Sequence, residues 1–146
     1  EKEQIKSKQL LIELRKTLWR TQIDAKTLTK HEKDEWGGLA FRGAKMPDWH
    51  TARPLIFLAT MLGDNRLTSK EEHFSEIMSI TKSLRFLKQI SIKDADLYRI
   101  LDESSAIGGI QDGLSSQRMR LSATSLTLLA VIETLNSLQN IKTNPK

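Results

Sequence analysis

The chain has 146 residues, with 23 Lys and Arg against 18 Asp and Glu, a net charge of +5 and no cysteine. This length suits a single domain whose core needs neither metal nor disulfide, and the missing cysteine excludes disulfides, a thiol nucleophile and a cysteine-ligated zinc site. No uninterrupted apolar run approaches the roughly 18 residues of a membrane span, so we expect a soluble chain without a membrane partner.

Apolar residues recur at spacings of three and four between a small number of glycines and prolines, and this periodicity is typical of helices. Alternating runs of β-branched residues, which would predict strands, are not found in the sequence. We therefore predict an all-α bundle of six or seven helices. The expected helices lie at about 3–22, 29–36, 53–62, 70–89, from 91 onward, at 105–112 and at 116–138.

Each predicted helix has an apolar face that we expect to point into the core. In the first helix this face holds Leu11, Leu14 and Leu18, with Leu10 beside them. Gly63 is expected to end the helix at 53–62 in the left-handed conformation. In the last helix the inward face is expected to hold Leu121, Leu128, Ile132 and Leu135.

Residues 1–139 are expected to form one helical domain, followed by a disordered polar tail at 140–146. Inside the domain, 26–68 is interpreted as an irregular insertion rich in aromatic residues. Its aromatic side chains, interleaved with Arg42 and Lys45, could stack on exposed bases while the cations bind phosphates. They could instead pack over the helices, which the burial of large apolar groups favours. The aromatic residues concerned are Trp36, Phe41 and Trp49.

Residues that could carry catalysis or bind a metal are few. His31, His50 and His73 form no pair at the helical spacing of metal ligands, so we expect surface histidines and no metal site. Gly108–Gly109 lacks the Lys-Ser/Thr that completes a phosphate loop. The carboxylates of Asp102–Glu103 would project about 100° apart on a helix. We predict that the chain is not an enzyme and takes no cofactor.

The second half of the chain resembles a known family. Leu84 and Leu87 precede a short break, 97–101 reads Leu-Tyr-Arg-Ile-Leu, and Ile107–Gly108 begins a pattern that ends at Leu114. Together these features resemble the N-terminal domain of the transcription elongation factor TFIIS and its relatives, which include the integrase-binding domain of LEDGF. The resemblance covers mainly residues 80–135 and implies a compact right-handed helical bundle.

In that family, Ile107 would anchor a short helix in the core and Gly108 would allow a close backbone approach. The resemblance also implies a nuclear interaction module that binds short disordered motifs of transcription and chromatin proteins at its inter-helical loops. Ile23 and Leu114 would line the groove, and the carboxylate of Asp24 would accept a hydrogen bond from a peptide amide.

Two other functions stay open on the sequence alone. Residues 1–30 carry a net charge of +4 and residues 116–146 of +3, so the basic ends could bind nucleic acid. Alternatively, the domain could be part of a scaffold that buries 36–57 inside a larger complex. The candidate phosphate contacts are Lys8, Arg15, Lys16, Arg20, Arg118 and Arg120.

Overall fold

Four helices dominate the computed structural model, which describes residues 2–27, 33–41, 46–100 and 106–143. They are α1 (Lys2–Trp19), α2 (Ala52–Leu62), α3 (Lys70–Gln89) and α5 (Leu121–Thr143). Four short 3-10 helices accompany them: η1 (Ala25–Thr27), η2 (Lys33–Glu35), η3 (Trp49–Thr51) and η4 (Asp94–Arg99). Among the described residues, the only β-type pairings are isolated bridges, so the fold is all-α as predicted.

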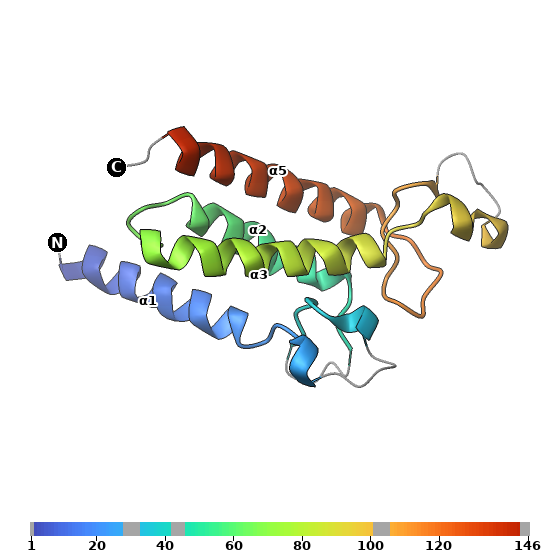
Figure 1. Ribbon diagram of the computed structural model, residues 1–146, viewed down its shortest axis with the longest axis horizontal. Coiled ribbons are helices and arrows are strands. Elements are labelled where there is room, and N and C mark those ends of the chain that lie inside the picture. Colours follow the sequence, from blue (N-terminus) through green and yellow to red (C-terminus); the bar gives the residue numbers. More distant parts are fainter. Residues whose placement is uncertain (1, 28–32, 42–45, 101–105, 144–146) are drawn as a thin grey trace.

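The sequence predicts six or seven helices, whereas the described residues form four α-helices. The segment expected to be helical from 91 contains only η4, because Ile92 is held in extended backbone by the turn at 108–109. Of the helix expected at 29–36, the described part is η2. Ribbons of α1 and α5 run along opposite edges of the bundle, with α2 and α3 between them (Figure 1).

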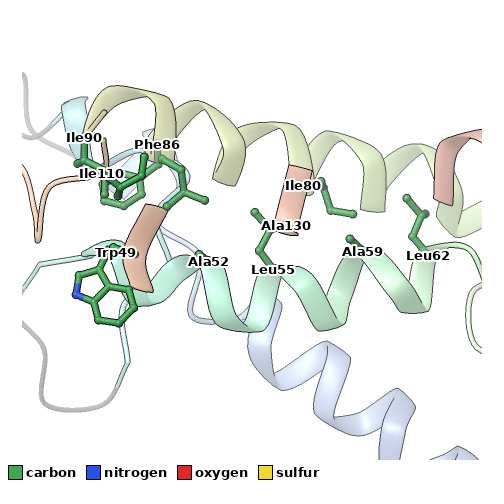
Figure 2. Packing of buried hydrophobic residues seen from close by; sticks show 12 residues of the cluster. Trp49, Ala52, Leu55, Ala59, Leu62, Ile80, Phe86, Ile90, Ile110 and Ala130 are labelled. Carbon is green, nitrogen blue, oxygen red and sulfur yellow. The ribbon is translucent and has the colours of Figure 1, made fainter. Parts of the chain in front are cut away.

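The hydrophobic core is centred on α2, which packs mainly against α5 and also against α3. Figure 2 shows the side chains of α2 meeting those of α3, with Trp49 closing one end of the row. The range 26–68 therefore contributes to the core through α2, which agrees with the helix predicted at 53–62. Fully buried core residues on α2 and α3 are Ala52, Leu55, Ala59, Leu62, Ile80, Phe86 and Leu87.

The contact between α2 and α5 is close because both helices present small residues to it. Ala123 and Ala130 of α5 are buried, and Ser137 Oγ donates a hydrogen bond of 2.7 Å to the carbonyl oxygen of Ala59. A Cβ atom on Gly63 would lie 2.9 Å from Ser137 Oγ. The sequence predicts a left-handed Gly63, but its φ is −77°, and close approach is what this position requires of its residue.

The orientation of α5 is opposite to the one that its leucine repeat predicts. The four residues expected to point inward are exposed, at fractions from 42% for Ile132 to 84% for Leu121. The alanines and hydroxyl residues of the opposite face are buried instead, because only small side chains fit against α2. The family resemblance implies instead that Ala123, Leu126 and Leu129 point inward. Ala123 is buried and Leu126 packs against the core, but Leu129 is exposed. The helix also continues through 140–143, so the predicted tail is at most 144–146, which lie outside the described residues.

Helix α1 is attached to α3 by a buried polar cluster rather than by a leucine stripe. Arg15 is 2% exposed, and its Nη2 atom donates to both carboxylate oxygens of Glu72 at 3.0 Å. Its Nη1 atom donates to Thr68 Oγ1 at 2.7 Å. The guanidinium thus occupies the inward position, and Leu14, which the sequence predicts to be inward, is exposed.

Glu76 completes this cluster from α3. Its carboxylate accepts a hydrogen bond from Trp19 Nε1 and lies 3.6 Å from Arg15 Nε. Burial raises the pKa of Glu76 above its ordinary value of 4.5. The neighbouring Glu72 behaves in the opposite way, because the backbone amide of Ser69, followed by Arg15, lowers its pKa. That amide bond is half of a capping box formed by Ser69 and Glu72 at the start of α3.

The loop that follows α3 departs from the family resemblance at one decisive residue. The turn itself forms, since the amide of Ile92 donates to Gly109 and the amide of Gly108 donates to Ile92. Gly108 has a φ of +80°, which favours glycine. However, Ile107 is 56% exposed, and Ala106 and Ile110 are buried in its place. The predicted core role of Ile107 is therefore wrong, because this turn points its side chain outward.

The α2–α5 contact generates a first prediction. Ala130→Leu places a larger side chain at a fully buried position, and overpacking is expected to lower the free energy of unfolding by about 1–3 kcal/mol. Chemical denaturation monitored by circular dichroism measures it. Ser125→Leu on the exposed side of α5 is the matched control, with an expected change within about 0.5 kcal/mol. Equal effects of the two substitutions would contradict the close contact.

The two glutamates of the polar cluster generate a second prediction. Glu76→Gln removes the titrating group but keeps an oxygen that can accept from Trp19. The folded protein holds the Glu76 proton more tightly than the unfolded chain does. The unfolding free energy of the wild type, relative to this variant, should therefore fall as the pH rises above 4.5 toward neutral. Denaturation curves at several pH values measure this difference.

Glu72→Gln serves as the control, because the pH dependence expected from Glu72 has the opposite sign to that expected from Glu76. Because the pKa of Glu72 is lowered in the folded state, its contribution to stability is present above 4.5 and is lost as the pH falls below that value. A difference between wild type and Glu76→Gln that stays constant between pH 4.5 and neutral would contradict the raised pKa of Glu76.

Candidate functional site

The loops at one end of the bundle enclose a cavity of about 480 Å³, which we call the loop-end cavity. It lies beside the start of α2, near the end of the molecule where α3 ends and α5 begins (Figure 1). Its walls are mainly apolar, and charged or polar side chains come from η3 and the first turn of α2. The lining residues are Leu39, Phe41, Met46, Asp48, His50, Arg53 and Pro54.

Local hydrogen bonds explain why these side chains converge. Asp48 caps η3, since its Oδ1 atom accepts the amide of His50 at 2.8 Å. The amide of Leu39 donates to the buried hydroxyl of Thr51 at 3.1 Å, which holds the preceding strand-like segment against η3. Pro54 then stands in the first turn of α2, where a missing amide is tolerated.

The rim of the loop-end cavity carries an ordered group of polar and aromatic side chains. His50 Nδ1 lies 2.9 Å from Asp48 Oδ1, so the carboxylate orients the imidazole and leaves Nε2 on the other side of the ring. The His50 ring stacks on Trp49 at a centroid distance of 4.0 Å. The guanidinium of Arg53 lies 5.3 Å from the centroid of the Trp49 ring and is exposed. An apolar cavity next to an exposed cation can hold an apolar group that carries a carboxylate nearby.

The aromatic residues of this region pack against the helices, as the sequence favours. Trp49 is buried in the core, and Phe41 is half-buried in the cavity wall. Trp36 is half-buried beneath the guanidinium of Arg85, which lies 4.7 Å from its ring centroid. The cations expected to help in base stacking, Arg42 and Lys45, lie outside the described residues.

The predicted partner-binding residues lie close to this end but do not line the loop-end cavity. Half-buried Ile23 pairs with Gly37–Gly38 through two backbone hydrogen bonds of 2.9 and 3.0 Å. Asp24 is exposed beside it. Leu114 is half-buried and packs against the core, next to a turn in which the carbonyl of Asp112 accepts the amide of Trp49.

The predicted nucleic-acid contacts are spread over two elements. Lys8, Lys16 and Arg20 are exposed on or just after α1, whereas Arg118 and Arg120 belong to the segment before α5, a loop at the end of the bundle where α3 ends (Figure 1). Arg120 Nε also lies 2.7 Å from Asp112 Oδ1 in an ion pair. The sixth cation, Arg15, is buried in the polar cluster and cannot reach a phosphate.

Side chains for metal binding or acid-base chemistry are sparse in the described part of the chain. No group of three or more His, Asp or Glu residues is placed there to hold a metal ion. His31, Asp102 and Glu103 lie outside the described residues, and His73 is half-buried on α3. The Asp48–His50 pair is the nearest approach to an acid-base arrangement, and Ser or Thr is not among the residues that line its cavity.

A second feature is the outward face of α5. Six large apolar side chains there are exposed at fractions from 36% to 84%, a set described further below. Among the described helices, α5 alone is long and apolar enough to cross a membrane by length and composition, with 22% of its most apolar window buried. The criterion of an uninterrupted apolar run missed it, because serine, threonine, asparagine and Glu133 interrupt the apolar residues of this helix.

Comparisons with family models, with curated proteins and with solved structures found no match to this chain.

Sequence reasoning missed the loop-end cavity because its walls come from segments up to fifteen residues apart that only the fold brings together. One signal was present in the sequence. Asp48 and His50 stand two residues apart shortly before a helix with proline in its first turn. At this spacing a carboxylate can accept a backbone amide as a cap and also orient the imidazole.

Proposed function

We propose that this chain is a non-catalytic protein-interaction module that binds short disordered peptide segments at its inter-helical loops, with the loop-end cavity as the anchor site. The observation that carries the proposal is an apolar cavity of about 480 Å³ with an exposed cation, Arg53, on its rim. The fitting ligand is a peptide whose aromatic or aliphatic side chain enters the cavity while an adjacent Asp or Glu pairs with Arg53.

Charge and rigidity support this ligand class. The chain carries a net charge of +5, which attracts acidic segments over a distance. The rim residues are held by η3, by the Trp49–His50 stack and by the core position of Trp49, so the site is formed before the ligand arrives. A disordered partner bears the ordering cost itself, and the expected Kd is on the order of 10 μM.

This proposal rests on the loop-end cavity and not on the resemblance to TFIIS, because the residue that the resemblance assigns to the core, Ile107, is exposed. A right-handed bundle, a role in transcription or chromatin and a nuclear location stay predictions from that resemblance. So does the contribution of Ile23, Asp24 and Leu114, which would have to contact the peptide beyond the cavity.

Nucleic acid is the less favoured ligand. Its predicted contacts are divided between α1 and the loop before α5 at the end of the bundle, and Arg15 is buried (Figure 1). A phosphate backbone is bound best by cations that share one surface. A scaffold role, in which a larger complex buries 36–57, is also less well supported than peptide binding. Trp49 and Leu55 from that range are already buried within the chain.

A peptide titration tests the proposal. The probe is a short synthetic peptide of Gly and Ser with one central Phe between two Glu residues, added to the isotope-labelled chain. The largest amide shifts in the NMR spectrum are expected at Leu39, Met46 and His50. Arg53→Glu should weaken binding about tenfold, because it replaces the attracting charge by a repelling one.

Lys16→Glu is the matched control, since it makes the same charge change at an exposed residue of α1. It should change the affinity less than about twofold at physiological salt, where distant charges are screened. If the two variants lose the same amount of affinity, binding depends on the net charge of the chain and not on the position of Arg53. If roughly 1 mM peptide causes no amide shifts in residues 39–54, the proposal is contradicted. It is also contradicted if a DNA duplex, added in place of the peptide, shifts the amides of Lys8, Lys16 and Arg118.

A further inference from the structure

The outward face of α5 carries large exposed apolar side chains from Leu121 to Leu135. Its exposed leucines at 121, 128 and 135 are separated by seven residues each, a repeat typical of helices that pair with other helices. The opposite face of the same helix is occupied by α2 through small residues, so the larger side chains have no partner within the described chain. The exposed set is Leu121, Leu128, Leu129, Val131, Ile132 and Leu135.

The scarcity of charged residues on α5 limits which kind of partner can cover its outward face. Although the chain as a whole is basic, Glu133 and Lys142 are the only charged residues of α5. Glu133 is half-buried beside the cavity it shares with Ser137, away from the leucine row. An acidic helix would need cations along the whole face, whereas α5 has none between 121 and 141 and Lys88 of α3 stands only beside Val131 at one edge. A second identical helix fits, because pairing two uncharged faces brings no like charges together.

A membrane fits the face less well than a second helix does. Helices that lie on a membrane surface carry Lys or Arg on the side next to their apolar face, and α5 has no such residue before Lys142. Crossing a membrane would require α5 to leave α2, which would break the hydrogen bond from Ser137 to Ala59 and expose Leu55 and Leu62.

Size and shape agree with a helix-to-helix contact between two copies. The exposed apolar residues of α5 extend from Leu121 to Leu135, about 21 Å along the helix axis, which is about four turns of helix. Beside Val131, a cavity of about 350 Å³ between α3 and α5 is lined by Leu84, Leu87 and Ile110. This cavity has room for an apolar side chain from the second copy.

We propose that the outward face of α5 is the contact surface of a homodimer, with α5 of one copy packed against α5 of the other. The dimer is independent of peptide binding at the loop-end cavity. The interface contains Leu121, Leu128, Ile132 and Leu135, which the sequence predicts to be core residues. In the dimer these residues form an apolar core between the two chains.

Analytical ultracentrifugation between about 5 and 200 μM tests the proposal. The wild-type chain is expected to sediment at twice its chain mass, with a dimer fraction that rises with concentration. The double variant Leu128→Glu, Leu135→Glu should raise the dissociation constant about 100-fold, because pairing would bury unpaired charges. Its helix content by circular dichroism should equal that of the wild type, since both residues are exposed.

The matched control is Ile5→Glu, Leu10→Glu, which makes the same change at two exposed apolar residues of α1 and should leave the dimer intact. A second readout uses the absence of cysteine. Ile132 is the midpoint of α5, so Ile132→Cys should form a disulfide between copies on mild oxidation whether the helices run parallel or antiparallel. Thr17→Cys on α1 should not.

Three results would overturn the proposal. The first is a wild-type chain that sediments as a monomer over the whole concentration range. The second is a dimer that survives Leu128→Glu, Leu135→Glu or is lost equally in the α1 control. The third is a monomer that co-sediments with phosphatidylserine vesicles and loses this binding in the α5 variant, which would assign the face to a membrane.

Discussion

The close contact of α2 with α5 determines where every other large side chain of the molecule can go. Ala59, Gly63, Ala130 and Ser137 bring the two backbones together, and a side chain longer than that of serine would force them apart. With that face filled mainly by small residues, Leu126 and Leu138 pack against the edge of the core, and the leucines at 121, 128, 129 and 135 point outward. The core is then completed from the other side, where α3 supplies its bulky residues to α2 (Figure 2).

The polar cluster around Arg15 joins α1 to α3 through charged hydrogen bonds and not through apolar packing. An unpaired buried guanidinium would cost several kcal/mol, whereas here the charge is matched by Glu72 and by acceptors on the α2–α3 connection. Such a cluster requires one relative position of α1 and α3, because its hydrogen bonds depend on direction more than apolar contacts do. Glu76 adds a buried carboxylate whose proton is held by the same surroundings.

Helix positions could be read from the sequence, but the directions of their faces could not. The limits of α3 and most of α1 and α2 follow from spacing, capping residues and glycines. The faces of α1 and α5 were mispredicted, because counting hydrophobic residues cannot anticipate a buried arginine or a helix that packs through alanine. Ile107 was mispredicted for a related reason, since its orientation depends on the turn around Gly108. The loop-end cavity depends on the docking of 39–41 against η3, a tertiary event with only the Asp48–His50 spacing as a local sign.

The uneven attachment of α1 has a mechanical consequence. Its carboxyl-terminal half is tied down by Arg15, Trp19 and the backbone pairing of 21–23 with 38–40, whereas its first turns face a cavity of about 630 Å³ beside Asp64 and Leu67. A helix clamped at one end frays from the other, so amide protons near Ser7 exchange with solvent through small local openings. Those near Trp19 exchange only when the whole bundle comes apart.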